Sequence, residues 1–148
     1  MSIRNTLVAA GLLSLSAFAL AQVEVKDAWA RLSVPGQKAT GAFMTLTSPQ
    51  GATLVGASTP QAAVAELHEM KMEGEVMKMH AVPSLELPAG KPVELKPGGF
   101  HLMLMDLKGP LPKDSTLPLT LLLRDAKGVE TRQEIQVPVS AVAPMHSH

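Results

Sequence analysis

The 148-residue sequence has no cysteine and no tyrosine, and only 3% of its residues are aromatic. Without a thiol, the chain cannot form a disulfide, a cysteine nucleophile, a zinc–cysteine cluster or a blue-copper site, which needs two His and one Cys. Acidic and basic residues are equal in number, at 13 each, and the basic ones form no cluster. This balance argues against nucleic acid or an anionic membrane surface as the partner.

The first residues have the pattern of a secretory signal. One basic residue, Arg4, precedes an apolar run from Leu7 to Leu20, and small residues lead up to a cleavage site after Ala21. The run of about fourteen residues is shorter than the roughly 20 that a membrane-spanning helix needs. We therefore expect residues 1–21 to be removed, leaving an exported, soluble, periplasmic protein that is not inserted in a membrane. An uncleaved anchor is the alternative.

The rest of the chain alternates short apolar runs with breaks that contain Gly or Pro. The runs recur at intervals of about 8–12 residues, and no long amphipathic helical pattern appears. This favours a single all-β domain, residues 22–140, with the Greek-key connections of a β-sandwich. Strands are expected at 23–34, 39–48, 52–58, 64–72, 75–82, 93–95, 100–107, 117–124 and 129–137. The last two should form a hairpin about residues 125–128, and Ser84 to Gly99 should be a long crossover.

Trp29, Phe43 and Met44 are expected in the core of the sandwich, because large apolar side chains supply much of the area buried on folding. The alternative is that one of these side chains shields a functional site.

Methionine and histidine are concentrated between Glu66 and Leu107, where six of the nine Met and three of the five His occur. Residues 66–80 have the alternation of a β-hairpin around Glu73-Gly74. We predict a register in which Met70 lies opposite Met77, His68 opposite Met79, and Glu69 opposite Lys78. A three-residue loop would instead shift one strand by one residue, and this would place the Met and His side chains of that strand on the opposite face.

The strand predicted at Phe100–Leu107 also alternates, so that His101, Met103 and Met105 share one face. If this strand lies near the hairpin, two imidazoles and two thioethers can converge from His68, Met79, His101 and Met103. Such a soft ligand set suits Cu(I), whereas hard cations prefer oxygen and structural zinc prefers thiolate. A Met-rich core without metal is the alternative, because Met often fills gaps in apolar interiors.

The spacing of these four residues resembles that of the periplasmic copper chaperones called PCu(A)C. The gaps are ten, twenty-one and one residues, and the segments VPGQKATGAFM, LHEMKMEGEVMKM and PAGKPVELKPGGFHLMLMDLKGPL are similar to the family as well. The resemblance implies a cupredoxin-like β-sandwich that carries Cu(I) towards the copper centre of cytochrome c oxidase. It implies His68, Met79, His101 and Met103 as ligands, with Met70, Met72, Met77 and Met105 as lesser candidates.

The last residues, 141–148, are expected to be a flexible tail that carries Met145, His146 and His148. Imidazole accepts Cu(II) as well as Cu(I), so His146 and His148 are candidate ligands for a second copper, Cu(II). A solvated tail without a role is the alternative.

No sequence pattern of a catalytic triad, a phosphate-binding loop or a zinc protease is present, and we expect a protein that is not an enzyme. The main hypothesis is a chaperone that hands Cu(I) to an acceptor with paired thiols, either an oxidase subunit or a thiol copper carrier. The alternatives are a periplasmic copper storage or tolerance protein, and a structural or adhesive β-domain.

Overall fold

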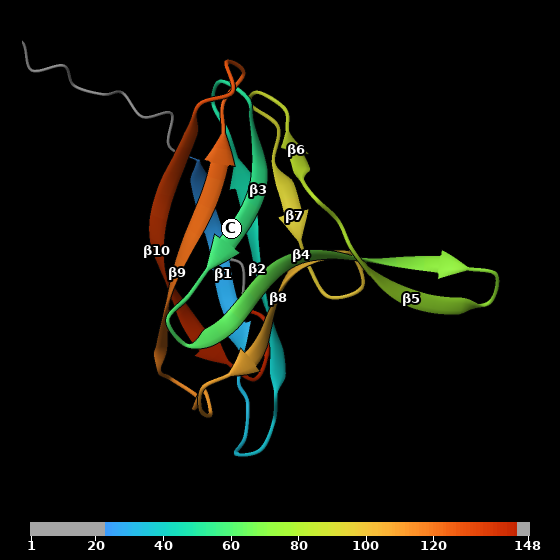
Figure 1. The fold of residues 1–148 in the computed structure, drawn as a ribbon, viewed down its shortest axis with the longest axis vertical. Coiled ribbons are helices and arrows are strands. Elements are labelled where there is room, and N and C mark those ends of the chain that lie inside the picture. Colours follow the sequence, from blue (N-terminus) through green and yellow to red (C-terminus); the bar gives the residue numbers. More distant parts are fainter. Residues whose placement is uncertain (1–22, 145–148) are drawn as a thin grey trace, which may run out of the picture.

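The computed structural model describes residues 23–144, which contain ten β-strands and no helix (Figure 1). The all-β prediction is confirmed, and within this range no helix is available to cross a membrane. The expected signal segment, residues 1–21, and the tail residues 145–148 lie outside the described residues. In chain order the strands are β1 (Glu24–Arg31), β2 (Ala39–Thr47), β3 (Ala52–Ser58), β4 (Ala62–Glu73), β5 (Val76–Ala81), β6 (Leu85–Leu87), β7 (Val93–Leu95), β8 (Phe100–Leu107), β9 (Thr116–Arg124) and β10 (Glu130–Ser140).

The strands form one hydrogen-bonded path in the order β5-β4-β8-β2-β1-β10-β9-β3-β6, with β7 added beside β2. Only β1 and β10 pair in parallel; the other paired strands of the described chain are antiparallel. Neighbours such as β4–β8 and β8–β2 are far apart in sequence, as the crossovers of a Greek-key sandwich require. The path folds over on itself, so that both halves contribute to one core.

Apolar side chains at alternate positions of the strands fill that core. On β8, Leu102 and Leu104 are fully buried, and they pack with Leu119 of β9 and Val137 of β10 in a single apolar cluster. Because side chains on a strand alternate between faces, the residues between these leucines must point to the outer face of the sheet. The outer face of β8 therefore carries His101, Met103 and Met105, as the sequence pattern predicts.

The predicted crossover from Ser84 to Gly99 contains two short strands, β6 and β7, of which β6 was not expected. Its three residues lie between Pro83 and Pro88, which interrupt any longer strand pattern. Pairing with β3 and complete burial of Leu87 hold β6 in place. Tertiary contacts, which local sequence does not encode, make this segment a strand.

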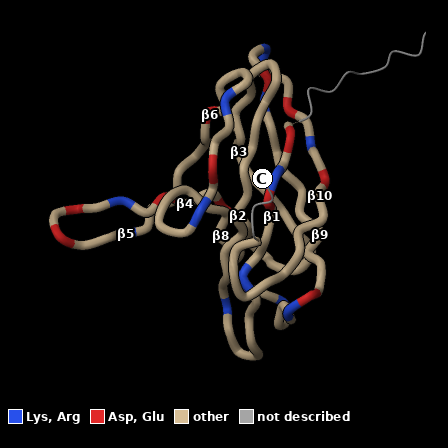
Figure 2. Tube along the Cα trace, turned by 180° about the vertical axis from the view of Figure 1, so that it is seen from behind, with Lys and Arg blue, Asp and Glu red and all other residues tan. Residues whose placement is uncertain are grey.

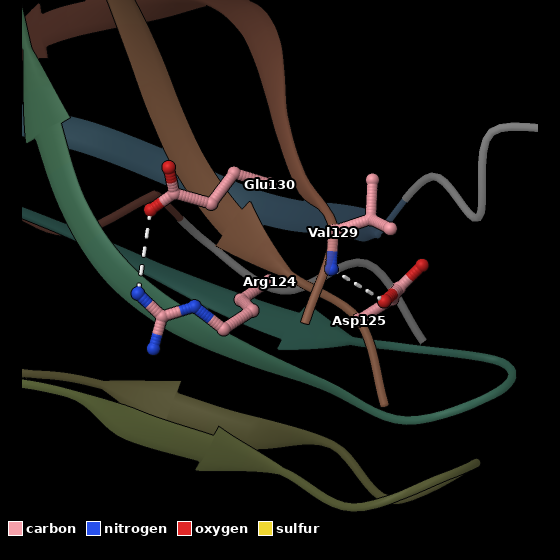
Figure 3. A network of polar contacts seen from close by, with 4 residues as sticks. All are labelled: Arg124, Asp125, Val129 and Glu130. Carbon is pink, nitrogen blue, oxygen red and sulfur yellow. Dashed lines mark hydrogen bonds and ion pairs between the residues drawn. The ribbon is translucent and has the colours of Figure 1, made fainter. Parts of the chain in front are cut away.

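The predicted hairpin between β9 and β10 is confirmed by an unbroken antiparallel register, and Figure 3 shows polar contacts at its turn. The carboxylate of Asp125 accepts hydrogen bonds from the backbone N–H groups of Lys127 and Val129 at 2.8 and 2.9 Å. At the base of the turn, Arg124 donates to Glu130 at 3.3 Å. These contacts close the turn and involve no metal-binding side chain of the predicted set.

A second hairpin, formed by β4 and β5, extends away from the sandwich (Figure 1). Pairing of β4 with β8 ends at Glu69, and β5 pairs with no strand other than β4 in the described chain. We call the projecting part, residues 70–79, the hairpin arm. Figure 2 shows that the arm carries charges of both signs. Every residue of β5 is exposed, so the arm is held by backbone pairing with little apolar packing.

The predicted register of this hairpin is wrong by two residues. Met70 lies opposite Met79 rather than Met77, His68 opposite Ala81 rather than Met79, and Glu69 opposite His80 rather than Lys78. The turn is Gly74-Glu75 and not Glu73-Gly74, because Gly74 takes the first turn position with a φ of 68°. Positive φ at the first turn residue alone is the signature of a type II′ turn, which favours Gly there. A shift of two keeps every side chain on its predicted face.

Candidate metal centre

A cavity of about 320 Å³ opens on the outer face of the sheet, where β2, β8 and the base of the hairpin arm meet. Its walls come from five strands and two loops, and none of its lining residues is acidic, among those the structure describes. The lining residues are Arg31, Gln37, Ala39, Thr40, Gly41, Phe43, Met70, Met79, Pro97, Gly98, His101 and Met103.

Four of the predicted ligands line this cavity together. Met70 and Met79 are direct cross-strand partners at the base of the arm, while His101 and Met103 lie on the outer face of β8. Across residues 23–144, no group of three or more His, Cys, Asp or Glu side chains is arranged to hold a metal ion. Any metal bound in the cavity would therefore depend on thioether sulfur together with imidazole nitrogen.

The ring of His101 is fixed by its backbone surroundings. Its Nδ1 lies 3.2 Å from the carbonyl oxygen of Gly99, which can only accept a hydrogen bond, so Nδ1 carries the proton and Nε2 keeps a free lone pair. Burial lowers the pKa of His101 below its ordinary value; nearby His68 lowers it further, and the bond to Gly99 opposes the shift. The neutral form, which is the form that binds metal, is therefore favoured near neutral pH.

His68 lies directly across from His101 on β4, with 5.9 Å between the ring centroids. Its Nε2 lies 3.0 Å from a carboxylate oxygen of Glu66, and its Nδ1 is buried with no hydrogen-bond partner within residues 23–144. The carboxylate fixes the proton on Nε2 and leaves the lone pair of Nδ1 unused, an arrangement typical of metal-binding histidines. An unpaired buried polar atom costs roughly 1–3 kcal/mol, which a bound metal would offset.

Glu66 was not predicted to take part in the site. It is two residues before His68, so the strand alternation that placed His68 on this face also places Glu66 there. His68 itself does not line the cavity. Its ring lies beside the ring of His101, which does line it.

Aromatic side chains cover one side of His101. The ring of Phe43 lies 6.1 Å from that of His101, and Trp29 lies 4.8 Å from Phe43. Arg31 is positioned over both aromatic rings, at 5.7 Å from each centroid. Trp29 and Phe43 are buried as predicted, but they are on the outer face and outside the apolar cluster that contains Met44. Phe43 thus has the position expected of a side chain that shields the site.

Gly41 makes room for this aromatic group. A Cβ atom at Gly41 would lie 2.9 Å from Cζ of Phe43, closer than side chains tolerate. We expect Gly41→Ala to displace the Phe43 ring and to lower the free energy of unfolding by about 1–3 kcal/mol, the usual cost of overpacking. Denaturant unfolding measures this change.

Gly56→Ala is the matched control, because a Cβ there would meet Leu122 at an ordinary 3.7 Å. Equal stability changes in the two variants would contradict the close approach of Phe43 to Gly41.

The remaining candidates that the structure describes lie away from the cavity. Met105 faces Ala39 and Val64 further along β8 and does not line it. Met72 and Met77 are exposed on the outer half of the arm. His146 and His148 lie outside the described residues.

Comparison with known proteins places the chain in a family. The sequence model described as "Putative lipoprotein LpqE-like" matches residues 23–139. The chain belongs to the LpqE-like family. The chain is also 32% identical, over 118 residues, to "Putative lipoprotein Lxx21020" of Leifsonia xyli subsp. xyli. This match covers 79% of the chain and 69% of that relative.

Solved structures share the fold of the LpqE-like protein. Apo-DR1885 from Deinococcus radiodurans is 30% identical, with a TM-score of 0.57 and coverage of 95% of this chain and 93% of that one. A Cu(I) form of DR1885 is 33% identical, with a TM-score of 0.58 and coverage of 86% and 85%. The copper-bound PCuAC domain from PmoF2 is 20% identical, with a TM-score of 0.63 and coverage of 81% and 93%. The resemblance to the PCu(A)C family is confirmed, as is the cupredoxin-like sandwich.

Proposed function

We propose that this LpqE-like protein is a copper chaperone, which binds one Cu(I) ion in the outer-face cavity. The observation that carries the proposal is the meeting of Met70, Met79, His101 and Met103 around one cavity. His68 is the further candidate ligand, because its buried Nδ1 finds no hydrogen-bond partner in the part of the chain that the structure describes. The similarity to DR1885, for which a Cu(I) form is known, supports the choice of metal.

The chemistry of the cavity favours a soft monovalent ion. Thioethers are neutral and soft, and they bind Cu(I) without first losing a proton. No carboxylate lines the cavity in the described chain, whereas Mg²⁺ and Ca²⁺ require oxygen ligands. No catalytic step forms part of the proposal, because the metal is the cargo.

A competition titration tests the choice of metal. Purified protein without residues 1–21 should bind one equivalent of Cu(I) or Ag(I) tightly at the cavity, and an excess of Zn(II) should not displace it. The reason is that thioethers together with imidazole form a softer ligand set than zinc prefers. Stoichiometric Zn(II) binding that competes equally with Cu(I) would contradict the proposed site.

We propose further that the protein delivers Cu(I) to an acceptor with paired thiols, either the copper subunit of cytochrome c oxidase or a thiol carrier that serves it. Met79, with 45% of its surface exposed, gives an acceptor access to the site from solvent. A thiolate can displace one thioether at a time, and the leaving sulfur needs no proton.

Mixing the Cu(I)-loaded protein with a reduced, soluble oxidase copper domain tests delivery. Copper should move to the acceptor, as followed by separating the two proteins and measuring the metal in each. Retention of copper against every acceptor with free thiols would favour a storage or tolerance role.

Export to the periplasm is part of the proposal. It is supported by the signal pattern in residues 1–21 and by a relative whose name describes a lipoprotein.

A second copper, Cu(II), at His146 and His148 stays a prediction from the sequence. The described chain ends close to the site: Pro144 lines a small cavity with Trp29 and Pro97, and Pro97 also lines the outer-face cavity.

A further inference from the structure

The outer half of the hairpin arm carries two methionines that the cavity does not use. Met72 and Met77 are direct cross-strand partners, and 58% and 45% of their surface is exposed. This part of the arm has passed the end of β8, and no third strand of the described residues lies beside it. Burial in a core, the usual role of Met, therefore does not explain the pair.

The register places these two side chains at a point of close approach. The N–H of Val82 donates to the carbonyl of Leu67 at 2.9 Å, so these residues form a hydrogen-bonded pair. Bonded and non-bonded pairs alternate along a hairpin, and Met72 is an odd number of positions beyond Leu67. Met72 and Met77 are thus a non-bonded pair, whose Cβ atoms lie about 4.5–5.5 Å apart. Two long, flexible thioethers can close on one ion across that span.

The two faces of the arm differ in charge. Glu73 contacts His80 at 2.7 Å and Lys78 at 3.6 Å, and all three belong to the face opposite Met72 and Met77. Within the arm, the methionine face consists of the two pairs Met70–Met79 and Met72–Met77. The inner pair lines the cavity, and the outer pair lies two residues further out on the same face.

We propose that Met72 and Met77 form a second, low-coordinate site for a soft monovalent cation, Cu(I) or Ag(I), through which metal enters or leaves the cavity. The inference rests on the proposed function and adds a route to it. An ion held by the outer sulfurs gains a bond to Met70 or Met79 before an outer bond breaks. The thioethers are neutral, so the exchange moves no proton and no electron.

Methyl NMR of the protein tests the outer site. With ¹³C-labelled methionine methyl groups, the first equivalent of Ag(I) should shift the signals of Met79 and Met103. Further Ag(I) should shift Met72 and Met77 together, while the core residue Met44 stays unchanged. The Met72→Leu/Met77→Leu variant should lose the second phase and keep the first. It should also take up Cu(I) from a soluble Cu(I) chelate more slowly, with unchanged affinity at the cavity.

Val76→Ala is the matched control, because Val76 is exposed at the same tip but on the other face and has no sulfur. Signals of Met72 and Met77 that stay unmoved when Ag(I) is added beyond the equivalent that fills the cavity would overturn the inference and leave the proposed function standing. If Met72 and Met77 respond but Met79 and Met103 do not, the outer site stands and the proposed function fails. Equal slowing of copper uptake in the Val76→Ala variant would overturn the entry route.

Discussion

The Met79→Leu/Met103→Leu variant is expected to fold normally and to lose Cu(I) affinity by about 100-fold or more. Removing a residue that only supports a metal ligand already lowers affinity by up to about 100-fold, so removing two ligands should lower it at least as much. Leu keeps nearly the volume of Met, and such exchanges usually cost less than about 1.5 kcal/mol. Here the loss of packing should be small, because Met79 is half exposed and Met103 is only partly buried. Competition against a Cu(I) chelator measures affinity, and denaturant unfolding measures stability.

Met105→Leu is the matched control, since Met105 shares the strand and face of Met103 but does not line the cavity. We expect this variant to keep wild-type Cu(I) affinity. A double variant that binds Cu(I) as tightly as the wild type would show that the sulfurs of Met79 and Met103 serve packing only.

Acidification is expected to weaken Cu(I) binding, and His101 sets the pH at which this begins. Protons compete with the metal for Nε2 only below the pKa of the ring, which burial lowers from 6.5. The affinity for Cu(I) should therefore be nearly constant above this lowered pKa and fall in more acidic solution. His101→Met, which keeps a soft ligand but cannot be protonated, should show a weaker dependence. Chelator competition at several pH values measures the profile.

The same pKa shift predicts how the metal-free protein responds to acid. Because the folded-state pKa of His101 lies below its unfolded value, the unfolded chain binds more protons between the two. The stability that His101 contributes is complete above about pH 6.5, the ordinary value, and is lost as the pH falls through the lowered pKa. His101→Met should remove this part of the slope. A wild-type stability that rises on acidification through this range would contradict the role of burial.

The sequence predicted on which face of a strand each side chain lies, but it did not predict the pairing register of the β4–β5 hairpin. Alternation assigns His101 and Met103 to one face of β8 whatever lies beside that strand. The partner of Met70, in contrast, depends on which turn position Gly74 occupies, and the sequence Glu-Gly-Glu allows either. The two-residue error left the methionine face intact, which explains why Met70 and Met79 still line one cavity with His101 and Met103, although His68 does not line it.

Other features of the site depend on tertiary contacts that local patterns do not reveal. Phe43 reads as a core residue, and only the structure shows it lying across Gly41 and beside His101. The carboxylate of Glu66 shares a face with His68 by alternation, but its hydrogen bond depends on side-chain geometry. The strand β6 exists because β3 pairs with it.

Copper K-edge X-ray absorption of the protein loaded with one equivalent of Cu(I) tests the central claim most directly. The proposed site predicts a monovalent edge and a first shell that contains both sulfur and imidazole nitrogen. The sulfur contribution should diminish in the Met79→Leu/Met103→Leu variant and stay unchanged in Met105→Leu. A first shell of nitrogen and oxygen alone in the wild-type protein would contradict a thioether site for Cu(I) in the outer-face cavity.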